Sequence, residues 1–121
     1  MEYESAVVVE SQIAPGVTYT IARMSFVRRL ELMRQVRGLA RRKEFTEAGQ
    51  DAGSRMEGAL LQSEIDRLYV MWGLREVHGL TIDDAAATPE ALAGAGPENL
   101  FREALAAVRK ETGLSETERK N

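Results

Sequence analysis

The stretch that decides the fold is Ala14-Pro15-Gly16-Val17-Thr18-Tyr19-Thr20-Ile21-Ala22-Arg23-Met24-Ser25-Phe26. Pro15-Gly16 is a turn dipeptide, because proline fixes φ and glycine accepts a positive φ. From Val17 to Ile21, large β-prone residues alternate with threonines, which is typical of a half-buried strand. Ser25 is a preferred N-cap residue, so Phe26 begins a helix. The stretch therefore predicts a turn, a strand and a helix start in close succession.

A second strand is predicted before the turn. Val7-Val8-Val9 and Ile13 precede Pro15-Gly16, which gives a β-hairpin over residues 6–24. Because an isolated hairpin is only marginally stable in water, this one must pack on other elements.

A basic helix is predicted over residues 25–48, with Gly49 as its stop. At 3.6 residues per turn, its apolar residues form one stripe that is expected to face inward. The stripe consists of Phe26, Leu30, Met33, Val36 and Ala40, widened by Leu32 and Leu39. Arg29 falls inside this apolar arc, so it must snorkel, pair with a carboxylate or face a partner.

An apolar helix is predicted over residues 52–77. One of its faces carries Leu61, Ile65, Leu68 and Trp72. Towards its end the apolar residues cover the remaining faces as well, which is typical of central core or of core plus a subunit interface. These residues are Val70, Met71, Leu74 and Val77.

Two more helical segments are predicted within residues 88–112. Thr88-Pro89 combines a cap with proline at the first helical position, and Pro97 begins the final helix, which Gly113 ends. Before them, Leu80-Thr81-Ile82 is a candidate short strand with Asp83-Asp84 as its turn.

The expected fold class is α+β, predominantly α-helical, with an N-terminal β-hairpin packed on three or four helices. We expect a single domain over residues 1–113, followed by a charged tail over residues 114–121. The chain has 121 residues and no apolar run long enough to span a bilayer. The acidic start, Met1 to Glu4, lacks the basic region of a secretory signal, so a cytoplasmic protein is expected.

The charge is segregated along the chain, although the net charge is only −3. Residues 23–43 contain eight basic residues against Glu31 alone. Such a segment indicates an acidic partner, which is nucleic acid, the acidic face of another protein, or the acidic helix that follows in the same chain.

Catalytic and metal-binding patterns are weak. The chain has no cysteine and one histidine, which excludes disulfides, thiolate zinc and histidine-rich metal sites. The carboxylates Glu64 and Asp66 are two residues apart on a helix and do not face each other. His78 follows a helix end, where a protonated imidazole complements the helix dipole. We therefore expect no enzyme, no cofactor and no metal.

The order of the parts resembles a known family. A hairpin that ends in Gly16-Val17-Thr18-Tyr19-Thr20-Ile21 runs into Met24-Ser25-Phe26, and an apolar helix and a small helical segment follow. This resembles the small tail assembly chaperones of long-tailed phages and prophages. The matching stretches are Pro15–Leu39, Glu64–Gly79 and Ala95–Asn121.

The resemblance implies a non-enzymatic chaperone that coats the helical tape-measure protein and helps recruit tail tube subunits. Such proteins act in the host cytoplasm and are not retained in the finished virion, and we expect this one to form homo-oligomers. A helical client requires apolar grooves and complementary charge. The residues expected to supply them are Arg29, Arg37, Arg41, Val70, Met71 and Leu74.

Many members of that family are made in two lengths through a −1 ribosomal frameshift. Lys120-Asn121 is compatible with a slippery heptamer in the message. We therefore expect a minor longer product when the gene is translated with its natural downstream sequence.

Two alternatives stay open at this point. One is a small nucleic-acid-binding module that uses the basic helix 25–48, although its basic residues spread around the helix and only Phe26 and Phe45 are available for stacking. The acidity of the whole chain also opposes general DNA binding. The other is a structural phage connector or baseplate component that stays in the particle.

Overall fold

The structure is a computed structural model that describes residues 1–49 and 51–113. Within these residues the chain has four helices and a three-stranded antiparallel sheet, which confirms the predicted α+β, predominantly helical class. The chain forms two compact units. We call residues 1–24 with 70–113 the sheet unit, and residues 25–69 the helical hairpin. The expectation of one domain over residues 1–113 stays a prediction.

The sheet unit is built around three strands in the order β1-β2-β3, so the N-terminal hairpin supplies two of them. The strands are β1 (Ala6–Glu10), β2 (Thr18–Ala22) and β3 (Leu74–His78). Val9 and Val77 pair with Tyr19 on the central strand, in agreement with the predicted alternation of the hairpin.

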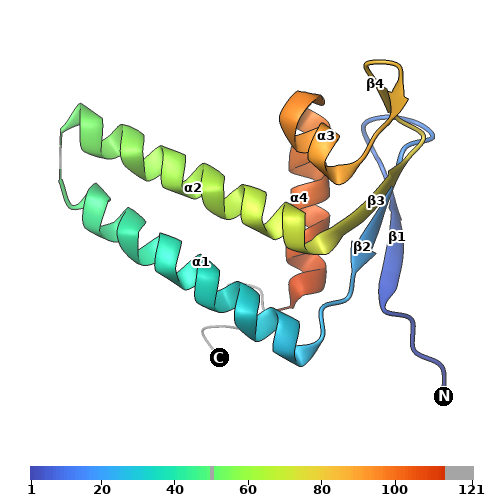
Figure 1. The fold of residues 1–121 in the computed structure, drawn as a ribbon, viewed down its shortest axis with the longest axis horizontal. Helices are drawn as coiled ribbons and strands as arrows, with labels where there is room; N and C mark the ends of the chain where they lie inside the picture. The colour runs from blue at the N-terminus through green and yellow to red at the C-terminus, as the bar shows by residue number, and fades with distance from the viewer. Residues whose placement is uncertain (50, 114–121) are drawn as a thin grey trace. The chain divides into compact units, whose positions relative to one another are not determined.

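One face of the sheet carries the core of this unit. Tyr19 and Ile21 on β2 are fully buried, as are Ala104 and Val108 on the helix α4 (Glu98–Thr112). The short helix α3 (Pro89–Ala95) contacts both α4 and β3. Figure 1 shows α3 and α4 beside the strands of this unit. Thr88 caps α3 and Gly113 ends α4, as the sequence predicts.

A two-stranded ribbon links the sheet to α3. It consists of β4 (Thr81–Ile82) and β5 (Ala85–Ala86), joined by Asp83 and Asp84. Both aspartates have a positive φ, 49° and 64°, which is the backbone shape of a tight hairpin turn. The predicted strand and turn are confirmed.

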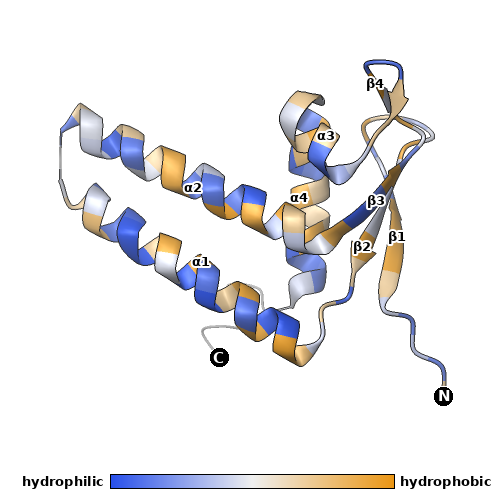
Figure 2. Cartoon of the chain, in the orientation of Figure 1, coloured by the Kyte–Doolittle hydropathy of each residue, from blue (hydrophilic) through white to orange (hydrophobic). Residues whose placement is uncertain are grey.

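The helical hairpin pairs α1 (Phe26–Glu47) with α2 (Ala52–Gly73), which runs back beside it (Figure 1). The Ser25 hydroxyl accepts a hydrogen bond from the Arg28 amide, and the Asp51 carboxylate accepts one from the Ser54 amide at 2.7 Å. Each helix therefore begins at a polar cap that satisfies a free backbone amide. Figure 2 shows hydrophobic and hydrophilic residues alternating along both helices.

The predicted end of the second helix at residue 77 is wrong. Helix α2 ends at Gly73, and the next five residues form β3. Gly73 lies against Val108 of α4, where a larger residue would collide. The close approach of α4 thus coincides with the point where the chain leaves the helix and joins the sheet.

The predicted inward stripe of α1 is wrong at its N-terminal end. Phe26 and Leu30 are exposed, whereas Leu32 is fully buried and Met33, Val36 and Ala40 are half-buried. The buried side of α1 is therefore turned by roughly 50° around the helix axis from the side that was predicted to face inward. Leu32, which was expected at the edge of the stripe, is its most buried member.

The tail over residues 114–121, including Lys120-Asn121, lies outside the described residues, as does Gln50 in the loop between the two helices.

Candidate partner-binding surface

The exposed side of α1 carries a straight row of six residues, which we call the outer row. They follow each other at spacings of three and four, so at 3.6 residues per turn they fall within an arc of roughly 80°. All six are exposed. They are Val27, Leu30, Arg34, Arg37, Arg41 and Phe45.

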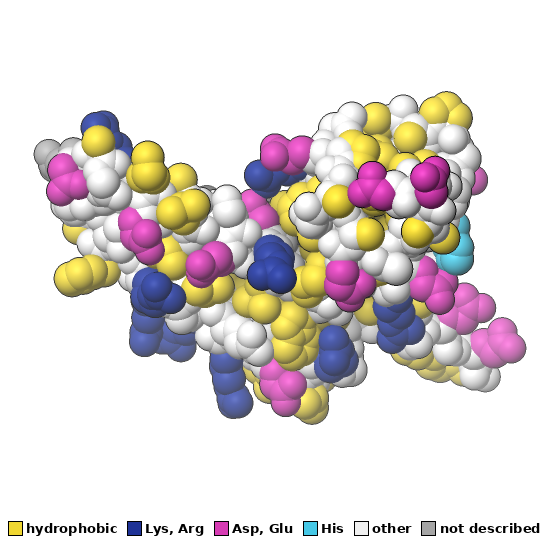
Figure 3. Space-filling view, turned by 45° about the horizontal axis from the view of Figure 1, so that its top comes forward, with side chains coloured by type: hydrophobic (Ala, Val, Ile, Leu, Met, Phe, Trp, Pro, Cys, Tyr) yellow, Lys and Arg dark blue, Asp and Glu magenta, His cyan; other side chains and the backbone are white. Residues whose placement is uncertain are grey.

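Apolar side chains stand at both ends of the outer row. Phe45 is 85% exposed, Val27 59% and Leu30 43%. Val27 and Leu30 lie about one turn apart at the N-terminal end of the row, and Phe45 lies about one turn beyond Arg41 at the other end. Figure 3 shows hydrophobic side chains exposed among basic ones on this unit.

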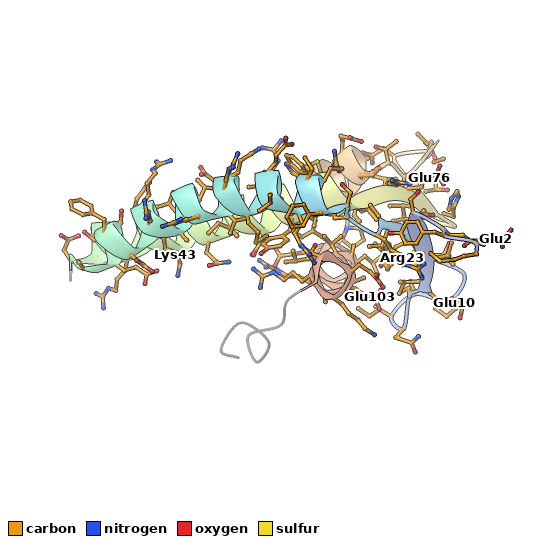
Figure 4. All side chains as sticks on the ribbon, turned by 90° about the horizontal axis from the view of Figure 1, so that it is seen from below. Glu2, Glu10, Arg23, Lys43, Glu76 and Glu103 are labelled. Carbon is orange, nitrogen blue, oxygen red and sulfur yellow. The ribbon has the colours of Figure 1, made fainter. Side chains whose placement is uncertain are left out.

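Three arginines occupy the middle of the outer row. Within residues 1–49 and 51–113, Arg34, Arg37 and Arg41 form no ion pair. Lys43 on the same helix does form an ion pair: its Nζ lies 2.8 Å from Oε1 of Glu47, one turn further on (Lys43 is labelled in Figure 4). The centre of the row is therefore a cluster of three arginines, none of which forms an ion pair with the described residues.

The outer row contains two of the six predicted partner-binding residues, Arg37 and Arg41. Arg29 is half-buried and lies on the same side of α1 as the half-buried Val36 and Ala40, outside the arc of the row, so it does not join them. The row's other members were missed, because Leu30 was assigned to the core and the remaining three were not grouped. The regular spacing from Val27 to Phe45 is the sequence signal that identifies the row.

Two of the apolar residues predicted to bind a partner are buried. Val70 is fully buried and Leu74 is 4% exposed, while Met71 is half-buried. Val70 and Leu74 belong to the core of the sheet unit. They cannot contact a client without unfolding, so the partner-binding surface must be built without them.

A second cluster of polar groups lies in the sheet unit. The carboxylate of Glu103 on α4 accepts hydrogen bonds from the Ser11 hydroxyl at 2.5 Å, the Tyr19 hydroxyl at 2.7 Å and the Gln12 amide at 2.8 Å. Figure 4 labels Glu103 on α4. All three donors come from the N-terminal hairpin, so the cluster fastens the hairpin to α4.

The pKa values of Tyr19 and Glu103 in this cluster are shifted away from neutral pH. Burial and the hydrogen bond to Glu103 raise the pKa of Tyr19 to about 12. Burial alone would raise the pKa of Glu103, but the hydrogen bonds from Ser11, Tyr19 and Gln12 outweigh it and lower that pKa. Near neutral pH the tyrosine is therefore protonated and the glutamate ionised, and neither titrates in the range that a general acid or base needs.

The described residues hold no group of three or more carboxylate or histidine side chains arranged for a metal ion. None of the helices in the described part of the chain is both long and apolar enough to cross a membrane. Comparison with protein-family models, with curated proteins and with solved structures finds no match to the chain.

Proposed function

We propose that the chain is a non-enzymatic tail assembly chaperone of a long-tailed phage or prophage. It binds the helical tape-measure protein through the outer row of α1 and helps assembly of the tail tube around it. It acts in the host cytoplasm as a homo-oligomer and leaves before the virion is complete.

The observation that carries this proposal is the outer row itself. A chaperone for a long helical client needs an exposed surface that covers apolar client side chains, together with charge that sets the register. Val27, Leu30 and Phe45 offer the apolar contacts, and the three arginines, which form no ion pair with the described residues, offer the charge. The order of parts from the hairpin to the final helix, which resembles the tail chaperones, supplies the identity of the client.

A nucleic-acid-binding module is the second candidate, because the same arginines would attract phosphate groups. That function does not account for Val27 and Leu30 in the row, and the exposed aromatics Phe26 and Phe45 lie at the two ends of α1 rather than between the arginines, where single-strand binders place them. It also predicts a steep, log-linear loss of affinity with salt, since phosphate binding releases counterions.

The proposal is tested by co-expression with the tape-measure protein of the same tail gene cluster. We expect the tape-measure protein to stay in the supernatant with the wild-type chain and to precipitate with the triple variant R34E/R37E/R41E. R42E is the matched control, because Arg42 is exposed on the same helix but lies outside the outer row. A tape-measure protein that precipitates equally with and without the wild-type chain would overturn the proposal.

Mass spectrometry of purified particles separates a chaperone from a component that stays in the virion. We expect the tail tube and tape-measure proteins to be detected and this chain to be absent. Detection of the chain in amounts comparable to the tape-measure protein would instead make it a connector or baseplate component.

A further inference from the structure

We propose that the outer row of α1 selects an acidic amphipathic helix, with carboxylates at its centre and apolar residues at both ends. This inference rests on the proposed function, and it names the feature of the client that the surface recognises. It follows from the spacing of the row, from the absence of an ion pair between its arginines and the described residues, and from the burial that binding imposes.

The spacing of the outer row suits a helix as the occupant. From Val27 to Arg41 the intervals are three, four, three and four residues, which is the heptad spacing of the contact positions in a coiled coil. The row runs straight for roughly 27 Å from Val27 to Phe45, since a helix rises 1.5 Å per residue. A second helix can therefore lie along it over about five turns.

The arginines determine which helix is accepted. A helix packed along the row would cover Arg34, Arg37 and Arg41 and remove much of their hydration. Covered charges are costly unless each finds a carboxylate, so a purely apolar helix would be rejected although it could contact Val27 and Phe45. The row thus combines attraction for one class of helix with discrimination against another.

The geometry fixes the pattern in the partner. Along α1, Arg34 and Arg37 are separated by about 4.5 Å of rise, and Arg37 and Arg41 by about 6 Å. The matching helix carries three acidic residues at spacings of three and four on one face. Its apolar residues lie one to two turns beyond the acidic group on either side, opposite Leu30 and Phe45.

A second copy of the chain is the competing occupant. The exposed side of α2 carries Met56 and Leu60 together with Glu57 and Glu64, so it also mixes apolar and acidic residues. It offers two carboxylates seven residues apart and has Arg67 on the same exposed side. Because this pattern lacks the run of three acids, we assign the outer row to a different chain.

The inference is tested with three synthetic 25-residue helices, titrated by fluorescence anisotropy against the full chain. The first carries the acidic pattern described above, the second has glutamine in place of each acid, and the third moves the acids to the opposite face. We expect the first to bind roughly ten-fold or more tightly than the other two, because the other two helices leave the covered arginines without a carboxylate.

Reversing the charge of the three arginines provides a second test of the inference. R34E/R37E/R41E should lose the acidic peptide and gain a peptide with lysine in place of each acid, whereas R42E should behave as the wild type. Circular dichroism of each variant checks that its helices are intact. Equal binding of the acidic, glutamine and displaced-acid peptides would overturn the inference, as would tighter binding of single-stranded DNA than of any peptide.

The two proposals can fail separately. A chain that keeps the tape-measure protein soluble but does not distinguish the three peptides retains the proposed function and loses this inference. A chain that selects the acidic peptide but does not affect the tape-measure protein retains the helix specificity and loses the tail assembly role. Sedimentation velocity without peptide identifies a second copy, because occupation of the row by the chain itself would make R34E/R37E/R41E dissociate the oligomer.

Discussion

The Tyr19 hydroxyl donates a 2.7 Å hydrogen bond to the Glu103 carboxylate, and through it the central strand β2 is joined to α4. The Ser11 hydroxyl shares the same carboxylate oxygen, so the turn of the N-terminal hairpin is held at the same point. The Glu103 carboxylate therefore joins β2 and the hairpin turn to α4 at one point.

Removing the hydroxyl of Tyr19 should weaken this junction. Y19F leaves a part-buried carboxylate with one donor fewer, so we expect a loss of about 1–2 kcal/mol in the free energy of unfolding. Urea denaturation measures it. Y3F is the control, because Tyr3 is 67% exposed; similar losses in both variants would mean that the junction adds no stability.

The same junction should make stability depend on acid. The pKa of Glu103 is lowered in the folded state, so its contribution is fully present above the unfolded pKa near 4.5 and is lost as the pH falls through the folded value. We expect the urea midpoint of the wild type to fall in this range more steeply than that of E103Q. If the urea midpoints of the two proteins fell equally with decreasing pH, Glu103 would not be the group responsible for the acid dependence.

For Tyr19 the dependence of stability on pH runs the other way, because stability is lost as the pH rises. Its folded pKa is about 12 against 10.0 for the free side chain, so stability is complete below pH 10 and declines as the pH rises towards 12. Y19F should lack the part of this decline that Tyr19 contributes, and because both proteins contain Tyr3 and Tyr69, the difference between them isolates Tyr19. Urea midpoints of the two proteins at several pH values above 9 measure the difference.

Substitutions at Val70 and Val27 distinguish the buried core from the proposed binding surface. V70D places a charge in the fully buried site of Val70, and we expect a loss of more than about 3 kcal/mol, visible as unfolding by circular dichroism. V27D changes an exposed residue of the outer row, so it should keep the helicity and lose the client. Normal folding of V70D would mean that Val70 is accessible after all.

Two glycines test the backbone of the sheet unit. Gly79 has a φ of +80°, and a Cβ there would overlap the carbonyl oxygen of Gly16, so G79A should cost at least about 1 kcal/mol. Gly94 in α3 has open space around it, and G94A should stabilise the protein by about 0.5–1 kcal/mol. Thermal melts of the two variants should therefore shift in opposite directions, and a shift in the same direction would contradict the structure.

Local signals account for most of what the sequence predicts correctly. The Pro15-Gly16 turn, the Ser25 and Thr88 caps and the Gly113 stop each act on a few neighbouring residues. Ser25, Thr88 and Gly113 each border a helix, and Pro15-Gly16 lies in the turn between β1 and β2. These features depend on short-range backbone preferences, which a single sequence displays directly.

The strand β3 was missed for a reason that lies in another part of the chain. Leu74 and Val77 are three residues apart and both buried, which is a helical spacing. They point to the same side of the sheet because the register with β2 shifts between Thr20 and Ile21, and this bulge leaves one extra residue on β3. A bulge depends on the strand with which β3 pairs, so the sequence of β3 alone does not predict it.

The candidate surface was only partly predictable for a similar reason. Arg37 and Arg41 were identified from the density of basic residues, but Leu30 was placed in the core with Phe26. The helical hairpin offers α1 only one partner helix of its own unit, so the buried arc is narrower than its apolar residues suggest. The position of that arc, which decides what remains exposed, depends on long-range packing.

The absence of cysteine from the chain permits the most direct test of the outer row. A single thiol is introduced at Gly38, which borders the row and has open space around it, or at the exposed Gln35, which lies away from it. The rate of maleimide labelling is then measured with and without the bound tape-measure protein. The account predicts strong protection of G38C and little change for Q35C. Equal labelling of G38C in the free and bound states would show that the client binds elsewhere.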